Sequence, residues 1–196
     1  GHLPIVSTLL SHGANVNALM PAESECPGQT ALHVAASAAV VDVLVAGGAN
    51  VDVEAADTLL RPLNTAARAL LLDVVAALLA RGAEVVRYNE FSVRPAGGST
   101  PAPPKHVPHL MGDVLEYVRV GTPAKRAAML ELLLHAGLDP NEPYKLDGRE
   151  PVAETASRSE SGIVQLLLQA GASPEPVLET SDLDKLFPHG SAPTAA

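Results

Sequence analysis

The chain has 196 residues, 47% of them hydrophobic and 18% charged, with a net charge of −9. This apolar content suffices for a core and excludes disorder throughout, while the acidic balance argues against nucleic acid or an anionic membrane surface as the main partner. The longest apolar stretch near the middle, residues 74–80, is far shorter than the roughly 20 residues of a membrane span. The short stretch predicts a soluble protein. The single cysteine, Cys26, excludes an internal disulfide and fits a reducing compartment, the cytoplasm or nucleus.

An apolar pattern that ends at a glycine occurs five times along the chain. In each copy two apolar pairs stand four residues apart, which places one stripe on a helix, and the glycine that follows is suited to the left-handed residue that ends it. The glycines are separated by 35, 34, 55 and 34 residues. The pattern predicts helices over residues 5–10, 40–45, 74–79, 129–134 and 163–168.

A second recurring segment precedes three of these helices, at residues 30–36, 61–67 and 150–156. Pro62 and Pro151 suit the first position of a helix, where no N–H is needed, and Thr30 can accept a hydrogen bond from the first turn. Small residues follow in each copy, and they allow neighbouring helices to approach closely. Each full unit therefore contains two helices.

The motifs GANVN at 13–17, GQTALHVAA at 28–36, GANVD at 48–52 and DGREPVAETA at 147–156 resemble those of the ankyrin repeat, a unit of about 33 residues. The resemblance implies an all-α solenoid of stacked antiparallel helix pairs with short finger hairpins. It covers residues 1–175 and leaves residues 176–196 as a flexible C-terminal tail. The expected repeats span residues 1–27 (partial), 28–60, 61–91, 109–141 and 142–175.

Several units depart from the family pattern. The first has only its second helix, so we expect the chain to be a piece of a longer protein. The second unit runs 18 residues from Thr30 to Gly48, whereas the equivalent stretches of the third and fifth units run 21. This difference of three residues predicts a clipped first helix or link. Thr30 and His33 occur together only there, which puts the hydrogen bonding between later repeats in question.

The fourth unit carries 21 extra residues. Residues 92–108 hold five prolines and two adjacent glycines, a composition that predicts an inserted, exposed loop. The two helices of this unit are expected at residues 109–120 and 123–135.

The sharpest metal-like spacing is His106 with His109 and Asp113, which one helix could place on one face. Pro104 and Pro108 would interrupt that helix, and the pattern has too few ligands for a structural zinc site. We interpret it as a solvated loop and predict no metal.

Other candidates for chemistry have simple structural interpretations. Cys26 lies in a turn without a partner that the fold brings near, and His33 resembles the structural histidine of the family. No glycine-rich loop follows a strand, so nucleotide binding is unsupported. We predict no catalytic residue, no cofactor and no enzymatic activity in this chain.

The resemblance instead implies a monomeric protein-interaction module whose fingers and first helices line a concave face. Three of the five aromatic residues fall in fingers, where partner contact and local packing are equally open interpretations. An alternative is that the repeats are the targeting or substrate-recruiting arm of a larger enzyme or ubiquitin-ligase adaptor. The expected partner-binding residues are Tyr88, Phe91, Tyr144, Arg87, Asn89, Glu90, Lys145, Arg68 and Arg158.

Overall fold

The computed structural model describes residues 2–56, 58–85, 109–117, 121–142, 151–158 and 160–174. Within these ranges the structure is helical and contains no strand, which confirms the all-α prediction. The elements are α1 (Leu3–Ser11), α2 (Ala38–Ala46), α3 (Pro62–Arg68), α4 (Leu72–Ala80), α5 (Leu110–Gly112), the π-helical segment η2 (Asp113–Tyr117), α6 (Pro123–His135), α7 (Pro151–Ser157) and α8 (Ser161–Gln169).

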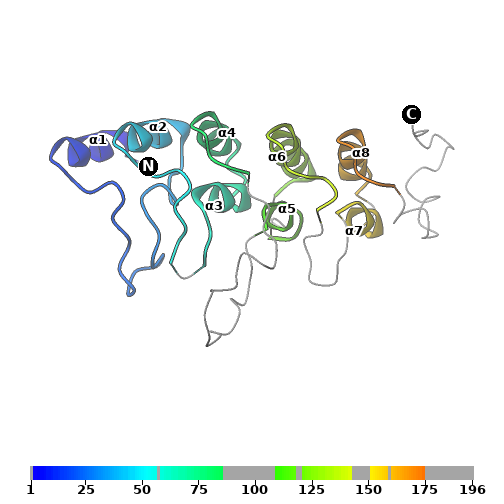
Figure 1. The fold of residues 1–196 in the computed structure, drawn as a ribbon, viewed down its shortest axis with the longest axis horizontal. Helices are drawn as coiled ribbons and strands as arrows, with labels where there is room; N and C mark the ends of the chain where they lie inside the picture. The colour runs from blue at the N-terminus through cyan, green and yellow to red at the C-terminus, as the bar shows by residue number, and fades with distance from the viewer. Residues whose placement is uncertain are drawn as a thin grey trace, which may run out of the picture. The chain divides into compact units, whose positions relative to one another are not determined.

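The chain divides into two units, residues 1–121 and 122–196. In the first unit α1, α2 and α4 follow one another side by side, while α3 packs on α4 and on η2 (Figure 1). In the second unit α8 packs on both α6 and α7 (Figure 1). The α3/α4 and α7/α8 pairs are each joined by a short link, so the two helices of a pair return alongside each other, as the repeat pattern predicts.

All five glycine-terminated helices of the sequence pattern are found, as α1, α2, α4, α6 and α8. Gly13 shows how each helix ends: its φ is +82°, and the next amide, of Ala14, donates to the Leu9 carbonyl at 3.0 Å. This pairing satisfies a carbonyl that the last turn would otherwise leave free. The same arrangement follows Gly48, Gly82, Gly137 and Gly171, each with a positive φ.

Two positions of these helices, eight and four residues before the glycine, form the core. In α2, α4, α6 and α8 the side chains there are at most 5% exposed. In α1 the same positions hold Ile5 and Leu9, which are 57% and 55% exposed. Within the described residues no first helix precedes α1, so nothing corresponding to α3 or α7 covers this side of it.

The second repeat is clipped in its first helix, as its length predicts. Residues 30–36 form turns, in which the amides of His33 and Ala35 donate to the carbonyls of Thr30 and Leu32 at 3.1 and 3.4 Å. The three missing residues correspond to most of one helical turn. A continuous helix such as α3 therefore does not form here.

The helices of the fourth repeat lie where the sequence predicts them, as far as this repeat is described. The helix expected over 109–120 appears as α5 and η2, which reach residue 117, and α6 covers the whole of 123–135. The expected loop at 92–108 and tail at 176–196 lie outside the described residues.

The fingers are closed by main-chain hydrogen bonds rather than by strands in the described part of the chain. The Met20 amide donates to the Gln29 carbonyl at 2.8 Å, and the Ala55 amide donates to the Leu60 carbonyl at 2.9 Å. A Cβ at Gly28, whose φ is +67°, would lie 3.0 Å from atoms of Ala56. Only glycine allows these two fingers to approach so closely.

Candidate interaction surface

Most of the sequence-predicted binding residues lie outside the described residues. These are Arg87, Tyr88, Asn89, Glu90, Phe91, Tyr144 and Lys145, and partner contact by them stays a prediction. Arg68 and Arg158 are described, and both are half-buried. What the structure does describe is the framework from which these fingers arise.

His33 joins the start of the second repeat to Leu60, the last residue of that repeat. Its Nδ1 accepts from the Thr30 amide at 3.1 Å, and because this nitrogen is an acceptor, Nε2 carries the proton and donates to the Leu60 carbonyl at 2.9 Å. Burial lowers the pKa of His33 below 6.5, against the raising effect of its backbone hydrogen bonds to Leu60 and Val53. A neutral, fully bonded imidazole has a structural role, as the sequence predicts.

Asn64 takes the place of that histidine in the third repeat. Its Oδ1 accepts from the Arg61 amide at 3.3 Å, and its Nδ2 donates to Asp113 Oδ2 at 2.9 Å. Asp113 is fully buried, and its other oxygen accepts from Arg68 Nε at 2.7 Å. In the third repeat, the hydrogen bonding that the loss of histidine put in question is thus made by a different set of side chains.

Asp113 and Arg68 are therefore bound to each other inside the first unit. The sequence gives no signal for this pair, since Asp113 stands out there only by its spacing from His106 and His109. Residues 68 and 113 are 45 positions apart, across the inserted segment, and no local pattern relates them. Among the described residues there is no cluster of three or more side chains suited to a metal ion.

A second set of links lies four residues after the terminal glycines. The Asn17 side chain donates to the Gly48 carbonyl at 3.0 Å and accepts from the Asn50 amide at 2.9 Å. Asn141 does the same with Gly171 and Ser173, at 3.1 and 2.7 Å. At the equivalent place Asp52 accepts from the Glu84 amide at 3.0 Å. The signal was present in the sequence, because GANVN, GANVD and GLDPN all end in Asn or Asp.

Arg61 lies at the base of two fingers, among three carboxylates. Its guanidinium is 3.3 Å from Glu54, 3.6 Å from Asp52 and 3.7 Å from Glu84. Arg61 occupies the place of the motif's Thr, and it gathers carboxylates from consecutive fingers around one cation. These contacts and those of Asn17, Asp52 and His33 fix the finger bases relative to one another.

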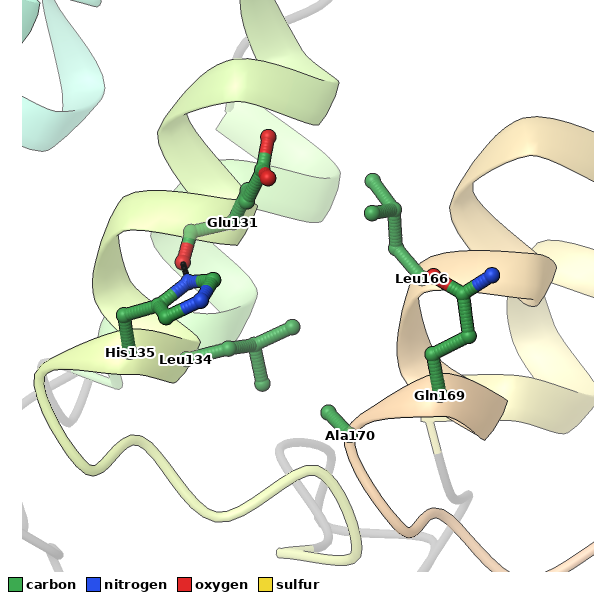
Figure 2. A pocket seen from close by; sticks show the side chains of 6 residues that line it. All are labelled: Glu131, Leu134, His135, Leu166, Gln169 and Ala170. Carbon is green, nitrogen blue, oxygen red and sulfur yellow. Dashed lines mark hydrogen bonds between the residues drawn. The ribbon is translucent and has the colours of Figure 1, made fainter.

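The second helices carry a different feature, a hollow of about 330 Å³ between α6 and α8. Leu134 of α6, Leu166 of α8 and Ala170, which directly follows α8, point into it, and Figure 2 shows Glu131, His135 and Gln169 around its edge. The His135 ring is held by a 2.8 Å hydrogen bond from Nδ1 to the Glu131 carbonyl (Figure 2). In the described part of the chain no basic side chain lies within ion-pair distance of the Glu131 carboxylate.

Comparison with known proteins supports the repeat assignment. The family model for ankyrin repeats matches residues 1–89 in three copies. No protein of the curated set matches. Among the described residues, no helix has the length and apolar character needed to cross a membrane.

Two solved structures resemble the fold. An ankyrin repeat domain from Acinetobacter baumannii AYE has a TM-score of 0.61 and 24% identity, over 85% of this chain and 74% of that one. The human ASB11 ankyrin repeat domain has a TM-score of 0.61 and 20% identity, over 87% of this chain and 65% of that one. Both matches extend well beyond residue 89, so the similarity of fold reaches past the part that the family model covers.

Proposed function

Because the chain carries an ankyrin repeat domain, we propose that it is a non-enzymatic protein-interaction module. The surface presented to the partner is the concave one, made by the fingers and the exposed side of the first helices. The partner is a protein, and the chain acts as a monomer in the cytoplasm or nucleus.

The observation that carries this proposal is the bonded framework at the finger bases. Asn17 to Gly48 and Asp52 to Glu84 join consecutive repeats through side-chain hydrogen bonds of 3.0 Å. His33 to Leu60, at 2.9 Å, closes the base of the finger within the second repeat. A loop whose base is already ordered loses less conformational entropy when it binds. Such preorganisation suits recognition by surface complementarity.

The proposed contacts at the finger ends are the aromatic residues Tyr88, Phe91 and Tyr144. The chain has no Trp and only five aromatic residues, while the described core is aliphatic. Aromatic side chains therefore are not needed to fill the helical core, and Tyr is enriched among residues that dominate binding energy. Arg87 and Lys145 beside them would orient an acidic or carbonyl-rich ligand, with Asn89 and Glu90 at the rim.

Arg158 remains a proposed contact. Arg68 binds Asp113 inside the first unit. Contact of Arg68 with a partner would have to preserve that ion pair. We therefore assign Arg68 a secondary place in the proposed surface.

The test begins with capture of partners by the intact chain, through proximity labelling or pull-down. Tyr88→Ala and Tyr144→Ala should then each reduce the binding free energy for the captured partner by about 2 kcal/mol, the loss typical of a dominant interface residue. Gln165→Ala is the matched control, because Gln165 is exposed on the second helix α8. Equal weakening by all three changes would contradict the concave-face assignment.

The alternative, a recruiting arm of a larger enzyme or ubiquitin-ligase adaptor, uses the same surface. Recovery of the full reading frame distinguishes the two, since an attached catalytic or adaptor domain would support the alternative.

A further inference from the structure

The positions that line the hollow between α6 and α8 have equivalents on α2 and α4, where the side chains include an arginine. Counted back from the terminal glycines, Glu131 occupies the same place as Asp42, six residues before the glycine. Ala170 occupies the same place as Arg81, one residue before the glycine. The carboxylate is thus kept in both places, and the cation is present in only one.

Between α2 and α4 the cation closes the gap. Arg81 extends from the end of α4 to Asp42 of α2, with its Nη2 at 2.8 Å and its Nε at 3.1 Å from Asp42 Oδ1. Between α6 and α8 the methyl group of Ala170 cannot reach Glu131, and the space that an arginine would occupy remains as the hollow (Figure 2). Arg81 therefore shows, within the same molecule, which side chain fits this geometry.

We propose that the hollow between α6 and α8 binds a basic side chain, best an arginine, of a partner protein. The guanidinium pairs with the Glu131 carboxylate, as that of Arg81 pairs with Asp42. The aliphatic stem lies on Leu134, Leu166 and Ala170, since long cationic side chains cover apolar surface with their methylene groups.

Two further side chains suit a cation. The Gln169 amide carbonyl is an acceptor at the edge of the hollow. His135 donates from Nδ1 to a carbonyl, so in the neutral ring Nε2 is an acceptor as well. The net charge of −9 adds a general attraction for a basic partner.

This site is independent of the proposed finger surface, because it lies on second helices and involves none of the finger residues. Variants of Tyr88 or Tyr144 should leave it intact. Each proposal can therefore be disproved by experiment without affecting the other.

The direct test uses N-acetyl-arginine N-methylamide as the probe, titrated into the isotope-labelled intact chain and followed by backbone amide chemical shifts. We expect concentration-dependent shifts at residues 131–135 and 166–170. The citrulline analogue has the same shape without the charge, and it should leave these amides unshifted. Equal shifts with both compounds would overturn the proposal.

Three variants make the test specific. Ala170→Arg restores the internal cation and should abolish the shifts, while Glu131→Gln should weaken binding about threefold to fivefold, as for an exposed ion pair. Glu23→Gln removes the same charge from an exposed residue elsewhere and should change nothing. Undiminished binding by Ala170→Arg, or equal weakening by Glu23→Gln, would overturn the assignment.

The reciprocal variant is Arg81→Ala, which should open a second site between α2 and α4. We expect the arginine probe to give new shifts near Asp42 and Ala77. Because the Arg81–Asp42 pair is exposed, its loss should leave the fold intact. Absence of new shifts in the folded variant would show that the shared register does not create a binding site, and the proposal would be wrong.

Discussion

Asn64 and His33 hold the same place in consecutive repeats, and they bind partners of different kinds. The longer imidazole donates to a main-chain carbonyl, that of Leu60. The shorter amide meets a carboxylate, Asp113, which comes toward it from η2. Both repeats therefore have a hydrogen-bonding side chain at this position, whereas its partner is within the repeat for His33 and in the following repeat for Asn64.

At the residue scale, local links could be predicted and distant ones could not. Gly13 and its equivalents follow from a repeated motif in which spacing carries the information, whereas the structural role of His33 follows from the resemblance to the ankyrin repeat. The Arg68–Asp113 ion pair joins residues separated by the inserted segment. Because the sequence holds one copy of this arrangement, no repetition reveals it.

Replacement of Arg68 by Ala should destabilise the first unit by roughly 2 kcal/mol or more, since it takes an ion-pair partner from a carboxylate that is completely buried. Arg81→Ala is the matched control, because it removes a guanidinium from an exposed pair worth at most about 1 kcal/mol. Urea denaturation of both variants measures the difference. Equal losses would mean that Asp113 does not depend on Arg68.

His33 makes the stability depend on pH. Its pKa in the folded protein lies below the ordinary 6.5, because burial opposes the charged ring. The unfolded chain then binds more protons between the two pKa values, so this contribution is complete above pH 6.5 and is lost as pH falls toward the folded pKa.

We expect His33→Gln to cost about 1–2 kcal/mol at pH 7.5, through the altered hydrogen bonds, and distinctly less at pH 5. Urea midpoints at the two pH values measure this change. A cost that is the same at both pH values would show that His33 is not the group whose protonation opposes folding.

At the element scale, the apolar period and the glycine that follows it predict where each second helix lies and ends. The first helices follow less directly, because their formation depends on the length available between the motif and the second helix. The third repeat has room for α3, whereas the second repeat, three residues shorter, forms turns. The length available within the repeat therefore decides whether a first helix forms, even where the local sequence would allow one.

Ile5 and Ile163 test whether the core positions depend on their neighbours. Both stand eight residues before a terminal glycine, but Ile5 is 57% exposed and Ile163 is 3% exposed. Ile163→Ala should cost about 2–5 kcal/mol, the range for a large aliphatic side chain lost from a core, and Ile5→Ala under about 1 kcal/mol. Denaturation of the two variants gives the comparison, and a large loss from Ile5→Ala would mean that the α1 face is covered in solution.

At the scale of the whole molecule, repeat proteins derive their stability from contacts between successive units. The repeats within residues 1–121 show how unequal these contacts are. There α4 packs on α2 and α3, whereas α1 packs on α2 and leaves two core positions in solvent. The family pattern predicts where the finger residues lie, whereas no motif of the chain identifies their partner.

Unfolding should therefore begin at residues 1–27 and not at residues 61–82. The Ile5 and Leu9 side chains contribute little burial to α1, while Val74, Val75 and Leu78 of α4 are at most 1% exposed. Amides in a segment with few buried contacts open at a lower free energy than those of the core. Native-state hydrogen exchange should show the α1 amides exchanging well before those of α4, and an extra loss of protection confined to residues 1–27 in Asn17→Ala, which removes the link to Gly48 and Asn50. If residues 1–27 were the better protected segment, stability in this chain would not follow the number of packed neighbours.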